Sequence, residues 1–190
     1  WWGLLGLVVS VAATLLCFTV HELCHGAVAY RLGDPTAKLC GRLTLNPIRH
    51  IDVAGLIMML VARVGWAKPV PVDMRNFKNP KRGMALTALA GPASNFLMAL
   101  AALALSSLIF HFAPFHPVWL VVLCFLCNVA LLSVGMGLFN LIPISPLDGS
   151  KIFFSFLPDK LYYTILKYER FVMIAVILLT FLGVFRRPLS

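Results

Sequence analysis

The chain has 190 residues, of which 61% are hydrophobic and only 12% charged, and its formal net charge is +9. A soluble domain typically carries about 25% charged residues. With a mean hydropathy of +0.92, the chain has too few polar side chains to cover a globule in water. This composition excludes a soluble enzyme, a disordered tail and a nucleic-acid module, and it indicates an integral membrane protein.

Four apolar stretches are long enough to cross the hydrocarbon core of a bilayer, which needs about 20 residues. They cover approximately residues 2–30, 84–112, 118–141 and 161–185. The first has no charged n-region, so we expect a span rather than a signal peptide. The fourth is weaker, because Lys167, Glu169 and Arg170 interrupt its apolar run. The sequence therefore predicts a polytopic α-helical membrane protein of about four helices, forming a single domain over residues 1–190.

Positive charge is concentrated between the first two spans, where ten of the sixteen Lys and Arg residues lie from Arg31 to Arg82. Short loops rich in Lys and Arg stay on the cytoplasmic side of a membrane. We therefore expect this segment and residues 142–160 to be cytoplasmic in a multi-pass protein of the cell membrane. No basic helical face of the kind that binds DNA is present, so the expected partner is the lipid bilayer and not nucleic acid.

The segment between the first two spans lacks the pattern of a long helix. Leu39–Pro47 alternates apolar residues between flanking Gly and Pro, which predicts a strand. Ala54–Ala62 is apolar but too short to span, so it predicts a re-entrant or interfacial segment. Trp66–Val72 contains two prolines spaced two apart, Pro69 and Pro71. This spacing predicts an edge strand, because proline is tolerated in sheets at an edge. Together these segments predict a small membrane-associated β-sheet or re-entrant region between helices 1 and 2.

His21, Glu22 and His25 form an HExxH motif inside the first predicted span. Positions i and i+4 lie one above the other on a helix, so both imidazoles can bind the same metal ion. The Glu between them has the position of a general base. A charged residue near the middle of a membrane helix costs at least about 2.5–3.5 kcal/mol, which indicates a function. We therefore expect Glu22 to be catalytic and both histidines to be metal ligands.

Two histidines leave a catalytic zinc one protein ligand short. Asp148 follows the third span, where Pro143 and Pro146 must end the helix while the chain is still apolar. Unwound backbone at membrane depth occurs only where it is buried or lines a cavity, and the expected topology places it on the same side as the HExxH motif. The residues favour Asp148 as the third ligand, with His50 and Asp52 of the charged loop as competitors.

Asn95 also lies inside a predicted span, near Gly83, Thr87 and Gly91, which are spaced four apart. Small residues at this spacing allow a second helix to approach closely. The amide can then either form a hydrogen bond across helices or act at the active site.

Seven short motifs run in order along the chain: HELCHG (21–26), LGDPTA (32–37), GRLTLNPIRHID (41–52), GWAKPVPV (65–72), RNFKNPKRGM (75–84), GPASN (91–95) and FNLIPISPLDG (139–149). This ordered set resembles the site-2 protease family of zinc intramembrane metalloproteases. It is most similar to the short bacterial or archaeal members without PDZ or CBS domains.

The resemblance implies one zinc ion per chain, bound by His21, His25 and Asp148, with Glu22 as the catalytic base. It also implies that Asn140 contacts substrate near the zinc. The segment Trp66–Val72 is similar to the edge strand that receives substrate in this family, which points to Lys68, Val70 and Val72 as substrate-binding residues.

The expected activity is hydrolysis of a peptide bond in or near the transmembrane segment of a single-span membrane protein, in regulated intramembrane proteolysis near the cytoplasmic side. A helical substrate must unwind before it is cut, and an edge strand could then pair with it. The alternative from another class is a metal-binding membrane transporter or a catalytically silent membrane protein that uses the same HExxH and Asp site.

Overall fold

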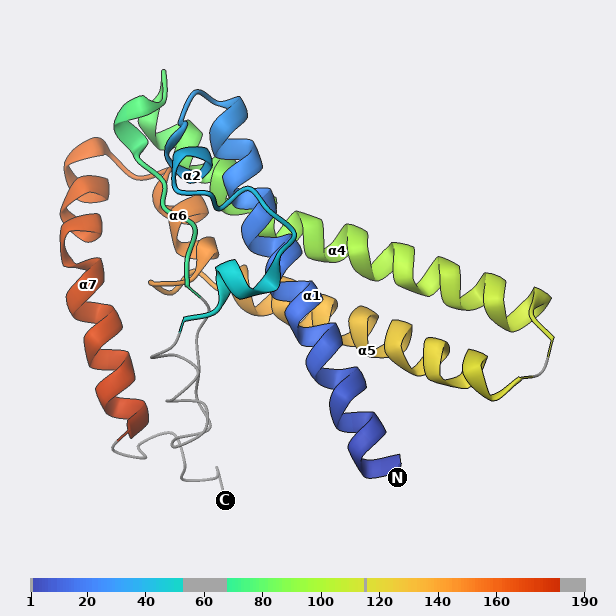
Figure 1. Ribbon diagram of the computed structural model, residues 1–190. Helices are drawn as coiled ribbons and strands as arrows, with labels where there is room; N and C mark the ends of the chain where they lie inside the picture. Colours follow the sequence, from blue (N-terminus) through green and yellow to red (C-terminus); the bar gives the residue numbers. More distant parts are fainter. Residues whose placement is uncertain (1, 53–67, 115, 182–190) are drawn as a thin grey trace.

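The computed structural model describes residues 2–52, 68–114 and 116–181, and the described chain is mostly helical (Figure 1). Three long helices dominate it: α1 (Trp2–Arg31), α4 (Pro80–Phe112) and α5 (Pro117–Asn140). Each is long and apolar enough to cross a membrane. The first three predicted spans are therefore confirmed as candidate membrane helices.

Helix α7 (Asp159–Phe181) forms over most of the fourth predicted span and stands apart from the three long helices in Figure 1. Its described residues do not qualify as a candidate span. Lys167 and Glu169 divide its apolar surface, as the sequence indicated. The prediction of a fourth span is therefore not confirmed.

Only short elements lie between α1 and α4 in the described chain: α2 (Thr36–Leu39), η1 (Pro47–His50) and η2 (Met74–Asn76). The strand predicted over Leu39–Pro47 is wrong, and the described residues contain no sheet. Local hydrogen bonds replace it, because Arg42 N–H donates to the carbonyl of Ala37 at 2.9 Å around a turn at Gly41, whose φ is +64°. The predicted re-entrant segment Ala54–Ala62 lies outside the described residues.

The predicted edge strand Trp66–Val72 is described from residue 68 onward, where the chain is extended but belongs to no assigned strand. We call residues 68–73 the strap. Lys68 N–H donates to the carbonyl of His50 at 2.9 Å, and Val70 N–H donates to Oε2 of Glu22 at 2.9 Å. These two donors therefore bind two different parts of the protein and do not form one ladder edge.

Small side chains hold the three long helices together. The buried cluster between them consists mainly of small residues: Ala13 and Cys17 of α1, Ala102 of α4, and Leu126, Val129 and Ala130 of α5. Hydrophobic driving force is weak between helices in lipid, so close packing through small residues and polar contacts between helices take its place.

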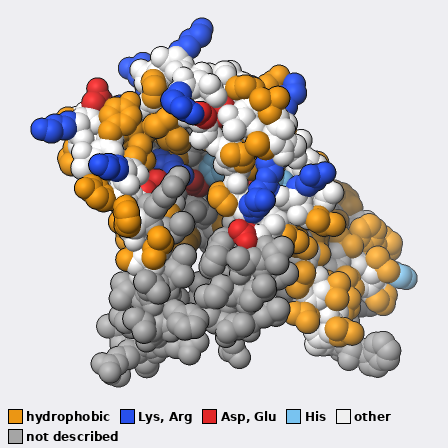
Figure 2. Space-filling view, turned by 60° about the vertical axis from the view of Figure 1, so that its left-hand side comes forward, with side chains coloured by type: hydrophobic (Ala, Val, Ile, Leu, Met, Phe, Trp, Pro, Cys, Tyr) orange, Lys and Arg blue, Asp and Glu red, His pale blue; other side chains and the backbone are white. Residues whose placement is uncertain are grey.

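Residues 113–116 separate α4 from α5 in the chain, and α1 crosses both of these helices (Figure 1). Asn79 caps α4 by accepting from Arg82 N–H at 3.1 Å, and Pro80 follows it as the first helical residue. Figure 2 shows Lys and Arg side chains gathered over the upper part of the molecule, whereas hydrophobic side chains cover its lower right part.

Candidate metal centre

His21 and His25 lie one turn apart on α1 and are almost fully buried, with exposed fractions of 4% and 8%. Their rings meet edge to face with centroids 4.5 Å apart, and their Nε2 atoms are 3.0 Å apart. The i, i+4 spacing thus does what the sequence predicted and brings both imidazoles to one point.

Asp148 reaches the same point from a different part of the chain. It is the first residue of α6 (Asp148–Phe154), and its Oδ2 lies 3.2 Å from Nε2 of His21 and 3.1 Å from Nε2 of His25. The chain turns back after α5 ends at Asn140, as the prolines at 143 and 146 predicted. A Cβ at Gly149 would lie 2.6 Å from the carbonyl oxygen of Ile142, so glycine allows α6 to begin against this turn.

These three side chains form a donor set that fits zinc. Among the described residues they are the one group of His, Cys, Asp and Glu whose ligand atoms all lie within 4.8 Å of one another. Tetrahedral ligands at about 2.0–2.1 Å from zinc are about 3.3 Å from each other, close to the separations observed. Oδ2 of Asp148 is buried and receives no hydrogen bond from the described residues. A cation bound between the three side chains would satisfy it.

Each imidazole is also held through its second nitrogen. A histidine that binds a metal through Nε2 carries its proton on Nδ1 and normally donates it to an acceptor. Nδ1 of His25 lies 2.7 Å from the carbonyl oxygen of Thr87. Nδ1 of His21 lies 3.1 Å from Nδ2 of Asn95, whose side chain is fully buried.

The hydrogen-bond network of Asn95 favours an amide in which the positions of Oδ1 and Nδ2 are exchanged. Its Oδ1 is buried and has no hydrogen-bond partner among the described residues, while its Nδ2 faces His21. The orientation of an amide is assigned from its hydrogen-bond network. A half-turn would place Oδ1 opposite Nδ1–H of His21. Asn95 of α4 therefore forms a hydrogen bond across helices, as the sequence allowed, and its partner on α1 is an imidazole of the candidate metal centre.

Gly91 provides the wall behind both imidazoles. A Cβ at this position would lie 2.5 Å from Cε1 of His25 and 2.6 Å from Cε1 of His21. The backbone of α4 is therefore packed directly against the rings. The spacing of small residues on α4 predicted that another helix packs closely against it. This spacing did not predict that the side chains in contact would be the two imidazoles.

Glu22 and the metal centre line a cavity of about 550 Å³ between α1, α4, the strap and the turn before α6. The predicted substrate-binding residues Asn140, Val70 and Val72 line it as well, and Lys68 does not. The amide of Asn140 donates to the carbonyl of Met136 at 3.0 Å. Val70 contributes its N–H to Glu22 rather than to an exposed edge, which differs from the predicted strand.

The two competing third ligands are not part of this group. His50 is buried at 2% exposure, and its Nε2 lies 2.9 Å from the carbonyl oxygen of Thr44. Asp52 does not belong to the group of side chains whose ligand atoms lie together in the described structure. The geometry therefore favours Asp148.

Comparison with known proteins identifies relatives named zinc metalloproteases. The chain is 37% identical over 187 residues to the protein named Putative zinc metalloprotease YwhC of Bacillus subtilis (strain 168), covering 91% of this chain and 81% of that protein. The model of peptidase family M50 matches residues 116–182. The chain belongs to peptidase family M50. The resemblance to site-2 proteases is thereby confirmed, and this M50 protein is a metalloprotease by family.

Two further relatives of this M50 protein carry the name Putative zinc metalloprotease Rip2. The chain is 31% identical to the one from Mycolicibacterium smegmatis and 32% identical to the one from Mycobacterium tuberculosis, each over 146 residues. These alignments cover 75% of this chain and 54% of each relative, so the chain spans about half of their length. No solved structure matches the chain significantly.

Proposed function

We propose that this M50 protein is a zinc-dependent intramembrane endopeptidase. It cuts a peptide bond in or near the transmembrane segment of a single-span membrane protein, in regulated intramembrane proteolysis. The observation that carries the proposal is the convergence of His21, His25 and Asp148 beside Glu22. The two histidines and Glu22 lie on α1, a helix apolar enough to cross a membrane. Residues 1–190 act as one domain in this proposal.

His21, His25 and Asp148 would hold the zinc, and a bound zinc supplies a Lewis acid that polarises a carbonyl and acidifies water. Glu22 takes the proton of the attacking water and returns it to the leaving nitrogen, a role worth typically about 10²–10⁴-fold in rate. Val70 N–H binds Oε2 of Glu22 and so leaves Oε1 to accept this proton. Thr87 and Asn95 keep the two imidazoles in place through their Nδ1 atoms.

The substrate must present an unwound peptide to these residues. Unwinding in lipid exposes backbone N–H and C=O groups, each at a cost of several kcal/mol. Asn140 and Val72 line the cavity, and the amide of Asn140 and the backbone of Val72 are proposed to receive these groups. The N–H groups of Lys68 and Val70 are already bound by His50 and Glu22, so a substrate strand pairs there only after displacing these contacts.

The placement of the charges supports a multi-pass protein of the cell membrane with its active site near the cytoplasmic side. Helices α1, α4 and α5 would be three of its spans and α7 the fourth. Glu22 lies nine residues before the end of α1 at Arg31, which is about 13 Å at 1.5 Å per residue.

The proposal is tested by comparing Asp148→Asn with Asp159→Asn in purified protein. Asp159 is exposed, pairs with Lys81 at 2.9 Å and does not line the cavity of the metal centre. We expect wild type and Asp159→Asn to hold one zinc per chain and to cut a reconstituted single-span substrate. Asp148→Asn should lose both the metal and the cleavage. Full zinc content and full cleavage in Asp148→Asn would contradict the assigned site.

A further inference from the structure

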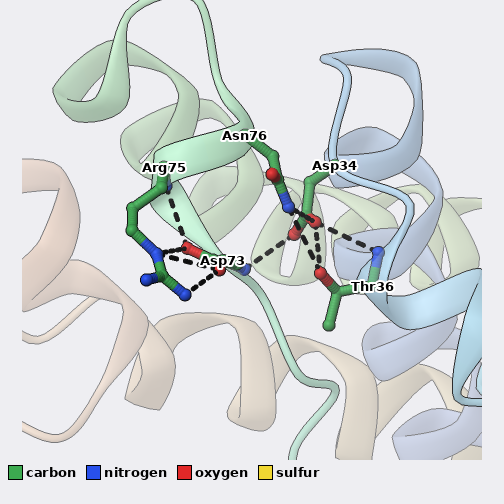
Figure 3. A network of polar contacts seen from close by, with 5 residues as sticks. All are labelled: Asp34, Thr36, Asp73, Arg75 and Asn76. Carbon is green, nitrogen blue, oxygen red and sulfur yellow. Dashed lines mark hydrogen bonds and ion pairs between the residues drawn. The ribbon is translucent and has the colours of Figure 1, made fainter.

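Asp34 is a carboxylate with no exposed surface, just beyond the end of α1. Its Oδ1 accepts from Thr36 N–H at 3.1 Å, from Thr36 Oγ1–H at 2.5 Å and from Asn76 Nδ2–H at 2.8 Å. Its Oδ2 accepts from Asp73 N–H at 2.7 Å. Figure 3 shows these contacts converging on Asp34 from both sides. Two of the donors, Asp73 and Asn76, lie 39 and 42 residues further along the chain. Asp34 therefore joins two distant parts of the chain.

The charge of Asp34 makes this junction strong. Burial acts to raise the pKa of Asp34, but the hydrogen bonds from Thr36, Asn76 and the two backbone N–H groups outweigh it, and the pKa lies below its ordinary value. The side chain is therefore a carboxylate. Hydrogen bonds to a charged acceptor are shorter and stronger than those between neutral groups.

The strap that Asp34 holds is short and stiff. It begins where Lys68 N–H binds the carbonyl of His50 and ends where Asp73 N–H binds Asp34. Pro69 and Pro71 lie between these ends, and each proline ring fixes its φ angle. The strap is therefore held at both ends with little freedom between them.

Val70 lies in the middle of the strap and connects it to the active site. Its N–H donates to Oε2 of Glu22 at 2.9 Å, and its side chain is 9% exposed. A Cβ at Gly26 would lie 3.2 Å from Cγ1 of Val70, so the strap packs closely against α1. Fixing the ends of the strap thus fixes the position of a donor on Glu22.

We propose that Asp34 is a positioning residue for proteolysis, which fixes the strap and so keeps the N–H of Val70 on Glu22. Asp34 itself does not line the cavity that holds Glu22 and the metal ligands. It acts through the backbone of residues 70–73. This inference rests on the proposed role of Glu22 as the base.

The test uses three single variants of the full chain, each loaded with zinc. Asp34→Asn removes the charge and one of the two acceptor oxygens, whereas Asn76→Ala removes one of the four hydrogen bonds and keeps the carboxylate. Asp159→Asn is the control matched in charge, since Asp159 is an exposed acid outside this network. Three quantities are measured: hydrogen exchange of the peptide covering residues 68–73, zinc per chain, and kcat and KM for a single-span substrate.

We expect Asp34→Asn to accelerate exchange in the strap by about tenfold or more, as the loss of a hydrogen bond to a charged group predicts. The value of kcat per bound zinc should fall by a similar factor with zinc content unchanged. Asn76→Ala should show the same changes to a smaller extent, and Asp159→Asn should match wild type. A merely structural role would lower the zinc-loaded fraction and leave kcat per bound zinc unchanged.

Two results would overturn the inference: exchange in the strap that stays at the wild-type rate, or faster exchange with an unchanged kcat per bound zinc. The exchange measurement does not depend on the identity of the catalytic base. An error in the role of Glu22 would appear separately, as cleavage that persists in Glu22→Gln.

Discussion

Replacing Gly91 with alanine should displace both imidazoles of the metal centre. The added Cβ would lie 2.5 Å from Cε1 of His25 and 2.6 Å from Cε1 of His21, and Nε2 of His25 lies closer still. Carbon atoms in ordinary contact are about 3.5–4.0 Å apart, so the rings must retreat by about 1 Å. Metal–ligand distances tolerate deviations of about 0.2 Å. We therefore expect the zinc affinity of Gly91→Ala to fall by about 100-fold or more, and proteolysis with it.

The assay is competition for zinc between the purified protein and a chelator of known affinity. Gly135→Ala is the matched control, because Gly135 lies within α5 and a Cβ there meets nothing within 4 Å. Alanine favours a helix over glycine by about 1 kcal/mol, so neither variant should unfold its helix for local reasons. A Gly91→Ala protein that binds zinc as tightly as Gly135→Ala would refute the packing of α4 against the two ligands.

Three further predictions concern the surroundings of the site. Asn95→Leu should weaken zinc binding by about 10–100-fold in the same competition assay, because His21 loses the acceptor for Nδ1–H. Asn95→Asp keeps an acceptor and should bind zinc. Equal zinc affinities of Asn95→Leu and Asn95→Asp would contradict this role of Asn95. Val70→Pro removes the N–H that binds Glu22 and should lower kcat while zinc content stays constant, so an unchanged kcat would show that this contact has no part in catalysis. The folded-state pKa of Asp34 is lower than its ordinary value of 3.8, so its contribution to stability is complete above that pH and is lost as the pH falls through the folded-state value. Thermal unfolding at a series of pH values should therefore show a loss of stability below about pH 4, which is smaller in Asp34→Asn.

The features that could be predicted from the sequence are those that follow from helix periodicity and from the free-energy cost of a charge in an apolar helix. The i, i+4 spacing of His21 and His25 fixes their common face wherever a helix forms. An acidic residue in an apolar helix is too costly to be accidental, which singled out Glu22. Asp148 could be predicted because Pro143 and Pro146 must end a helix in an apolar stretch. The structure places these side chains together, and their catalytic and metal-binding roles stay proposals.

The parts that escaped sequence reasoning depend on contacts between distant segments. The alternation in Leu39–Pro47 predicted a strand, but a turn at Gly41 and local hydrogen bonds prevailed because no partner strand lies beside it in the described chain. The prolines at 69 and 71 predicted an edge strand, but residues 68–73 belong to no strand. The two prolines carried no information that Val70 N–H would meet Glu22, or that Asp34 would hold the other end of the strap.

The most direct test of the account is Glu22→Gln in purified, zinc-loaded protein. Glutamine keeps an oxygen that can accept the N–H of Val70, and it leaves His21, His25 and Asp148 in place, so the fold and the metal site should be retained. We expect one zinc per chain and no cleavage of a single-span membrane substrate. Cleavage at the wild-type rate by Glu22→Gln would contradict the claim that this chain is a protease with Glu22 as its base.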